Sequence, residues 1–220
     1  MFSQIKRDIQ AVFERDPAAR SVTEVLLCYS GLHAIWWHRI SNRFWRWNLP
    51  LTARFISQLA RWLTGIEIHP AAKIGEGLFI DHGMGVVIGE TAELGRNVTL
   101  FQGVTLGGTG KEKGKRHPTL GNNVLVGAGA KILGSFTVGD DSLVGSNAVV
   151  LRPLPQKATA VGVPAEIVRL DGKRIDLLEH GKLPDPVHEC MEKLNQRIEM
   201  LEARVKELEA EKPASRRDIN

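Results

Sequence analysis

The middle of the chain carries an aliphatic residue at every sixth position. One phase runs through thirteen positions: Ile68, Ile74, Ile80, Val86, Ala92, Val98, Val104 and, after a step of sixteen, Leu120, Val126, Ile132, Val138, Val144 and Val150. A helix repeats about every 3.6 residues and a strand about every two, so neither explains this period. Faces of six residues, stacked as coils of a parallel β-helix, do explain it, and each coil buries its core only against its neighbours. We therefore predict a parallel β-helix over residues 65–169.

The step of sixteen marks an insertion of ten residues between two hexads. The inserted loop falls within residues 107–119 and reads GGTGKEKGKRHPT, which is rich in glycine and in basic residues. Loops that project from a rigid scaffold are common places for binding groups, so we predict that this loop belongs to a functional site. Its lysines, Lys111, Lys113 and Lys115, either attract the phosphates of a ligand or are simply solvated.

Residues 1–64 have the pattern of a small helical domain. The first apolar helix face consists of Ile5, Ile9, Val12 and Phe13, and Asp16-Pro17 ends this helix. Further apolar stretches run over residues 22–47 and 51–63. Four tryptophans and three arginines crowd the first of these, which is compatible with a helix on a membrane surface. Aromatic packing between neighbouring helices is the simpler interpretation, and we favour it.

A heptad repeat occupies the end of the chain. Its apolar positions alternate in steps of four and three: Val187, Met191, Leu194, Ile198, Leu201, Val205 and Leu208. This is a coiled-coil seam, which needs partner helices, so we expect a homo-oligomer. We predict a linker at 170–186, a coiled-coil helix at 187–211 and a flexible tail at 212–220. The residue types of the seam favour two strands, whereas a threefold scaffold would impose another number, and the sequence leaves this open.

Composition sets broad limits on function. The 220 residues are 43% hydrophobic and 25% charged, as in soluble globular proteins. The net charge of +4 is too small to indicate nucleic-acid binding but suits a phosphate-bearing ligand. Cys28 and Cys190 form no metal-binding spacing and indicate a reducing compartment. Without a long apolar run or a signal-peptide core, we expect a cytoplasmic protein that does not enter a membrane.

The stretch FIDHGMGVVIGE, residues 79–90, places Asp81 and His82 between two aliphatic runs. A neutral imidazole with a pKa of about 6.5 can remove a proton from a hydroxyl group at neutral pH. A lone histidine at a turn is more often structural, so the stretch alone fits either a catalytic base or a polar corner of the β-helix.

Seven stretches together resemble the serine O-acetyltransferase family. They are RDPAAR (15–20), GLHAIWWHRI (31–40), IEIHPAAKIGEG (66–77), IDHGMGVVIGETA (80–92), VTLGGTGKEKGKRHP (104–118), GAGAKILG (127–134) and GVPAEIV (162–168). The resemblance implies a helical domain, a left-handed parallel β-helix, and trimers with active sites between adjacent β-helices. It implies transfer of acetyl from acetyl-CoA to the L-serine hydroxyl, which gives O-acetyl-L-serine and CoA and begins cysteine biosynthesis. It further implies inhibition by L-cysteine and no metal.

The resemblance also assigns roles to single residues. His82 matches the catalytic base, and Glu67, where many members have aspartate, matches its acidic partner. The positions that match serine-binding residues are Asp16, Asp81, Arg116 and His117. The positions whose main chain matches the lining of the coenzyme A groove are Gly108, Ala128 and Ser146. Ala128 and Ser146 are eighteen residues apart, so we expect them to stack one coil above the other.

Other functions stay open at this point. A different hexapeptide acyltransferase could acetylate a sugar or a xenobiotic alcohol. A zinc-dependent β-helix enzyme would need three histidine ligands, for which His69, His82 and His117 are the candidates. A scaffold without catalytic activity would use the coiled coil as its interaction module.

Both ends of the chain depart from the family pattern. Many members have a longer helical region that joins two trimers, whereas in this chain fourteen residues precede the RDP motif. We therefore expect a trimer, unless the coiled coil pairs two trimers. Many members end in an isoleucine that enters O-acetylserine sulfhydrylase. Here Asn220 follows Ile219, and burial of its amide would be unfavourable, so we expect weak or absent binding to that enzyme.

Overall fold

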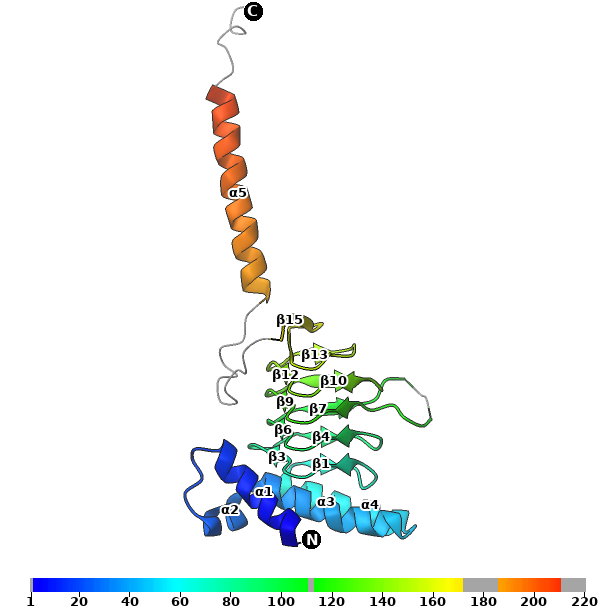
Figure 1. Cartoon of the computed structure of the whole chain (residues 1–220). Helices are drawn as coiled ribbons and strands as arrows, with labels where there is room; N and C mark the ends of the chain where they lie inside the picture. The colour runs from blue at the N-terminus through cyan, green and yellow to red at the C-terminus, as the bar shows by residue number, and fades with distance from the viewer. Residues whose placement is uncertain (1, 111–112, 172–185, 211–220) are drawn as a thin grey trace, which may run out of the picture. The chain divides into compact units, whose positions relative to one another are not determined.

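The computed structural model describes residues 2–110, 113–171 and 186–210 (Figure 1). The chain divides into two units, Met1–Leu183 and Pro184–Asn220, and each is described by itself. Lys111, most of the predicted linker, and the predicted tail with Ile219 and Asn220 lie outside the described residues.

Four helices precede the β-structure: α1 (Phe2–Arg15), α2 (Val22–Cys28), α3 (Ser30–Arg46) and α4 (Pro50–Thr64). The stretch over residues 22–47 is thus two helices, because Tyr29 between them has extended backbone angles. Ser21 caps α2 by accepting a hydrogen bond from the Glu24 amide at 3.2 Å. Pro50 begins α4, and Gly65 ends it at a φ of 71°, a left-handed conformation that favours glycine.

Short strands form three sheets that the chain visits in turn (Figure 1). The first sheet, called sheet A, holds β1 (Glu67–Ile68), β4 (Val87–Ile88), β7 (Thr105–Gly107), β10 (Lys131–Leu133) and β13 (Val149–Val150). Sheet B holds β2 (Lys73–Ile74), β5 (Glu93–Leu94), β8 (Thr119–Leu120) and β11 (Thr137–Val138). Sheet C holds β3 (Phe79–Ile80), β6 (Thr99–Leu100), β9 (Leu125–Val126), β12 (Leu143–Val144), β14 (Ala158–Val161) and the antiparallel β15 (Glu166–Leu170). The first unit is therefore a left-handed parallel β-helix with a helical region at its first coil.

The predicted inward positions form the core of the β-helix. Twelve of the thirteen are buried, and Ile74 is half-buried against the same cluster. In most hexads a second inward residue, two positions away, is buried as well, as Ile88, Leu100 and Leu106 show. Each coil therefore contributes two inward side chains per face.

The predicted phase is wrong by two residues between Ile80 and Leu120, and it is correct again from Leu120 onward. Ile68 pairs with Ile88 rather than with Val86, so the first coil takes twenty residues. The two additional residues lie in the turn at 81–86, which contains the Asp81-His82 pair. Leu106 and Leu120 occupy equivalent positions, so the loop at 107–119 has eight inserted residues rather than ten. The sequence could not separate the two phases, because both of them are aliphatic and both point inward.

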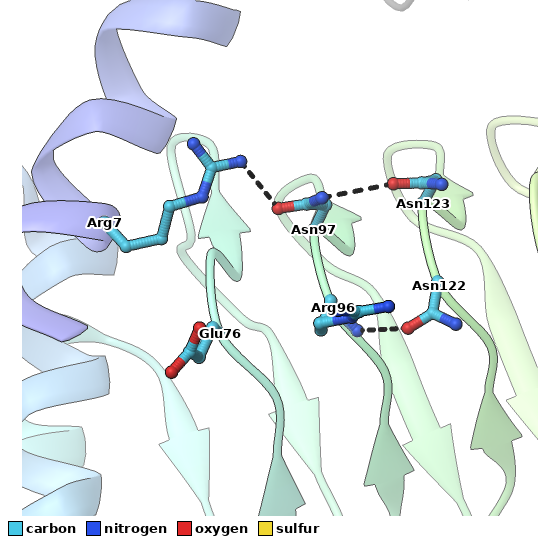
Figure 2. A pocket seen from close by; sticks show the side chains of 6 residues that line it. All are labelled: Arg7, Glu76, Arg96, Asn97, Asn122 and Asn123. Atoms are coloured by element: carbon cyan, nitrogen blue, oxygen red, sulfur yellow. Dashed lines mark hydrogen bonds between the residues drawn. The ribbon is translucent and has the colours of Figure 1, made fainter. Parts of the chain in front are cut away.

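Buried and amide side chains hold α1 against the β-helix. Arg15 at the end of α1 donates to the carbonyls of Gly77, at 3.0 Å, and Val98, at 3.2 Å. Arg7 donates a hydrogen bond to Asn97 at 2.9 Å, and the side-chain amide of Asn97 donates one to Asn123 at 3.3 Å (Figure 2). These contacts fix the position of Asp16, the predicted site residue that follows α1.

The second unit contains α5 (Pro186–Ala210). The described seam residues of this helix are exposed: Met191, Leu194, Ile198, Leu201 and Val205. In the described parts of both units, no helix has the length and hydropathy needed to cross a membrane. In the first unit, Trp36 packs against the core and Trp45 lies edge-on to His69, so both tryptophans pack against the β-helix.

Candidate active site

The turns between the sheets form three corners, and two of them carry all the predicted site residues except Asp16 and Glu67. The His82 corner, between sheets C and A, consists of residues 81–86, 101–104, 127–130 and 145–148. The Arg116 corner, between sheets A and B, consists of residues 69–72, 89–92, 108–110, 113–118 and 134–136. The remaining corner, between sheets B and C, carries the asparagines of Figure 2. Sheet A is therefore flanked by both corners that carry predicted site residues.

The His82 corner presents its imidazole to solvent. The His82 side chain is 73% exposed, and its Nε2 lies 3.9 Å from Oδ2 of Asp81. Its backbone has a φ of 56°, and its carbonyl accepts a hydrogen bond from Ser30 Oγ at 3.2 Å. At Gly83 a Cβ atom would lie 2.4 Å from Ile66, so only glycine allows this close turn. The backbone, rather than the imidazole, thus holds the corner in place.

The helical region brings a second carboxylate toward this corner. Asp16 follows α1, and its carboxylate accepts hydrogen bonds from the Tyr29 hydroxyl at 2.5 Å and the Ala18 amide at 2.8 Å. Desolvation raises the pKa of Tyr29 most, followed by the hydrogen bond and charge of Asp16, and the charge of Asp81 acts in the same direction. Tyr29 therefore lies within the electrostatic reach of Asp16 and Asp81, the two carboxylates that match serine-binding residues. Sequence reasoning missed Tyr29, the single tyrosine of the chain.

Glu67 lies beside the His82 corner but is paired elsewhere. Its amide donates to the Val86 carbonyl at 2.9 Å, which places it next to the end of the turn. Its carboxylate lies 3.3 Å from Arg61 of α4. Among the contacts of the described residues, none joins Glu67 to His82. The predicted pairing of these two side chains therefore stays a prediction.

The Arg116 corner is built around Thr91. The amides of Arg116 and His117 donate to Thr91 Oγ1 at 3.0 and 3.1 Å. The Thr91 amide donates at 3.2 Å to Nδ1 of His117, which is therefore unprotonated at that nitrogen. Burial, followed by the charge of Arg116, lowers the pKa of His117. His117 is thus held as a neutral imidazole with its proton on Nε2.

Arg116 forms a close ion pair with Glu90. The hydrogen bond from Arg116 lowers the pKa of Glu90 more than any other cause. The Arg116 guanidinium remains partly exposed, so it can also bind the carboxylate of a ligand. Glu90 and Thr91 lie within the IGETA stretch, but sequence reasoning gave them no role, because their contacts join residues 24 to 26 positions apart.

The three predicted coenzyme positions are also divided between the corners. Ala128 and Ser146 stack in successive coils of the His82 corner, as predicted from their spacing, and the amide of Asn147 donates to the Ala128 carbonyl at 2.7 Å. Gly108 lies in the Arg116 corner, where an added Cβ would be 3.1 Å from Arg116. In one copy of the chain these three positions therefore lie on two different corners. Each of these two corners, with its predicted site residues, is called a half-site.

The three candidate zinc ligands are divided in the same way. His69 and His117 belong to the Arg116 corner, and His82 belongs to the other. In the part of the chain that the structure describes, no group of three or more histidine, cysteine or acidic side chains could hold a metal ion. A zinc site made from these histidines would need ligands from two copies of the chain.

Comparisons with known proteins agree on one family. A family profile described as "Serine acetyltransferase, N-terminal" matches residues 1–36, and one described as "Bacterial transferase hexapeptide (six repeats)" matches residues 117–152. The serine acetyltransferase of Bacillus pumilus is 55% identical over 208 residues, covering 94% of this chain and 96% of its own. That of Bacillus subtilis is 55% identical over 207 residues, covering 94% of this chain and 95% of its own.

Solved structures of similar proteins carry ligands. Serine acetyltransferase from Brucella abortus in complex with coenzyme A is 43% identical, with a TM-score of 0.76 over 78% of this chain and 68% of that one. The Neisseria gonorrhoeae enzyme in complex with serine is 42% identical, with a TM-score of 0.74 over 76% and 69%. A serine acetyltransferase in complex with cysteine is 47% identical, with a TM-score of 0.75 over 76% and 69%. From its fold and from relatives that match almost its whole length, this chain belongs to the serine acetyltransferase family of acyltransferases.

Proposed function

We propose that the protein transfers the acetyl group of acetyl-CoA to the hydroxyl of L-serine, which gives O-acetyl-L-serine and CoA, the first step of cysteine biosynthesis. The main support is the presence of both half-sites on a fold whose relatives are serine acetyltransferases. The complexes of relatives with serine and with coenzyme A support the same pair of substrates.

In the proposed reaction, His82 is the general base. Its neutral imidazole takes the hydroxyl proton of serine while the serine oxygen attacks the thioester carbon. The carbon–sulfur bond of the tetrahedral intermediate then breaks, and the departing thiolate takes the proton back from the imidazolium. A carboxylate near the ring orients the imidazole and stabilises its charged form. We assign this role to Glu67, whose carboxylate would leave Arg61 to reach the ring.

Serine is proposed to bind between the two half-sites. Arg116 would hold the amino acid carboxylate through charge-assisted hydrogen bonds. Asp16 and Asp81, which both lie near Tyr29, would hold the ammonium group. L-cysteine differs from L-serine only in its thiol, so it would occupy the same position and compete. The complex of a relative with cysteine supports this inhibition.

A complete site then requires two copies of the chain. Since both half-sites flank sheet A, the His82 corner of one copy can face the Arg116 corner of the next. Head-to-tail contacts of this kind can close into a ring, and we propose that the ring is the trimer that the family resemblance implies. An exposed apolar row on α4 offers further surface for such contacts: Leu51, Phe55, Leu59, Trp62 and Leu63. This helix leads directly into β1 of sheet A.

An acceptor panel tests the proposal. The purified chain is incubated with acetyl-CoA and L-serine, D-serine, L-threonine, a galactoside or a xenobiotic alcohol, and the released thiol is measured. L-serine should give the highest kcat/KM, with O-acetylserine as the product. Faster acetylation of the sugar or the xenobiotic would identify a different hexapeptide acyltransferase and overturn the proposal.

A further inference from the structure

Helix α5 presents an apolar seam whose described residues are exposed. The five described seam residues are each 52–54% exposed: Met191, Leu194, Ile198, Leu201 and Val205. They alternate in steps of three and four, so they form one stripe along the helix. In heptad letters, Met191, Ile198 and Val205 are a positions, and Leu194 and Leu201 are d positions. Such a stripe is buried when copies of the same helix associate.

The residues that flank the seam carry opposite charges on its two sides. Arg197 and Arg204 immediately precede a positions and are therefore g residues. Glu202 and Glu209 immediately follow d positions and are therefore e residues. The two flanks of the seam therefore differ in charge: the g flank carries both arginines, and the e flank carries both glutamates.

This difference in charge distinguishes the two possible helix directions. In a parallel coiled coil, a g residue meets the e residue of the following heptad in its neighbour, which pairs Arg197 with Glu202 and Arg204 with Glu209. In an antiparallel coiled coil, g residues meet g residues and e residues meet e residues. That arrangement would place arginine beside arginine and glutamate beside glutamate, which is unfavourable. The charges therefore favour the parallel direction.

We propose that the α5 helices of the copies within one trimer associate in parallel as a three-stranded coiled coil, with Arg197 of each copy paired with Glu202 of the next. The strand number rests on the trimer of the proposed function, but the direction rests on the charges of α5 alone. Copies related by one rotation axis point their helices the same way, so a parallel coiled coil fits within one trimer. An antiparallel coiled coil would instead join two trimers. The coiled coil thus strengthens one trimer and does not pair two.

An ion pair within α5 is compatible with the proposed pairing between helices. Arg204 Nη1 lies 2.8 Å from Glu207 Oε2, and both side chains are 62% exposed. Exposed ion pairs of this kind contribute little stability. Arg204 can therefore exchange this partner for a glutamate of the neighbouring helix.

Disulfide cross-linking of the full chain tests the direction. Cys28 is exposed, so Cys28 and Cys190 are first changed to serine. In this background Val205→Cys places one thiol in the seam, and the matched control Ala203→Cys places one on the outer face. On oxidation, Val205→Cys should give covalent dimers several-fold faster than Ala203→Cys, with one chain of each trimer left unpaired. Light scattering should show the same mass before and after oxidation.

An antiparallel coiled coil gives a different result. It would pack a positions against d positions and bring residue 205 near Leu194 of the other helix. Val205→Cys alone would then not cross-link, whereas the Leu194→Cys/Val205→Cys variant would. That result, or a mass that doubles on oxidation, would overturn the proposal.

Charge reversal separates the ion pairs from the seam. Arg197→Glu/Arg204→Glu should slow the Val205→Cys cross-link several-fold, and adding Glu202→Arg/Glu209→Arg should restore it. Loss without restoration would overturn the proposed pairing. Acetyl transfer is measured on the same samples, so an inactive chain that cross-links as expected would contradict only the proposed function.

Discussion

The imidazole of His82 projects into solvent from a turn that backbone contacts and Gly83 hold in place. Removing the ring should therefore leave the fold intact and take away only the base. We expect His82→Ala to lower kcat by at least about a hundredfold, the usual scale for a lost general base. Steady-state kinetics measure the effect, and circular dichroism shows whether the fold is retained. Near-normal turnover in a folded variant would exclude His82 as the base.

Arg116 and its neighbour Lys115 form a matched pair for testing carboxylate recognition. Arg116 is partly exposed beside Glu90, whereas Lys115 donates to the Thr91 carbonyl at 2.7 Å. Arg116→Ala should raise the KM for serine by about one to two orders of magnitude, since a charged hydrogen bond contributes about 1.5 to 3 kcal/mol. Lys115→Ala should raise it far less. A larger effect on the KM for acetyl-CoA would place Arg116 on the coenzyme instead.

His38 makes stability depend on pH in the acidic range. Burial lowers its pKa from 6.5 to about 4, and its Nε2 lies 3.2 Å from the Ala72 carbonyl. Between these two values the unfolded chain binds more protons than the folded chain, so the free energy of unfolding falls as pH falls from 6.5 to 4. Below about pH 4 the folded histidine is protonated too, and this contribution stops changing.

The variant His38→Gln retains a side-chain donor for Ala72 but does not titrate. Its free energy of unfolding, measured by denaturant titration, should depend less on pH between 4 and 6.5 than that of the unchanged chain. Some dependence should persist, because desolvation lowers the pKa of His69 to about 4 as well. His82→Ala, which removes an exposed histidine, serves as the control. An unchanged slope in His38→Gln would contradict the assignment.

At the scale of elements, the amide ladder at the corner between sheets B and C joins the helical region to successive coils. It runs from Arg7 through Asn97 and Asn123 to Asp141, and Figure 2 shows its first three members. Asn97 and Asn123 also adopt φ values of 57° and 55°, which favour asparagine and glycine.

Two substitutions at Asn97 separate the ladder from the backbone. Asn97→Gly removes the side-chain hydrogen bonds but keeps the left-handed turn favourable, whereas Asn97→Ala removes the bonds and also strains the turn. Both should lower the free energy of unfolding, and alanine should cost about 1 kcal/mol more than glycine. Thermal unfolding measures the difference. Equal stability of the glycine variant and the unchanged chain would mean that the ladder contributes nothing.

The period of six was enough to predict the β-helix, because an aliphatic core repeats once per face. It did not predict the register after Ile80, since Val86 and Ile88 are both inward and only strand pairing chooses between them. The break at Tyr29 was also missed, because the apolar pattern continues through it. Asp81 and His82 could be selected from a motif, but Tyr29, Glu90 and Thr91 gain their positions from contacts across the fold.

At the scale of the whole molecule, the proposed division of the site between two corners can be tested by combining two defective variants in one assembly. If each site combines the His82 corner of one copy with the Arg116 corner of the next, two defective chains can complement each other. A mixed trimer of His82→Ala and Arg116→Ala copies contains contacts in which both corners are unchanged. Random mixing makes about a quarter of the contacts of this kind, because each corner is intact in half of the copies.

We therefore expect co-expressed His82→Ala and Arg116→Ala chains to acetylate serine, at serine concentrations well below the raised KM, many-fold faster than either variant alone. Each variant carries a different affinity tag, and two successive purifications isolate the mixed assemblies. Mixing the purified variants without subunit exchange is the control and should give no gain. If both corners of one copy formed each site, no mixed assembly could recover activity, because every chain would carry one defective half. Recovery in the mixed assembly alone would thus establish that neighbouring copies share the site.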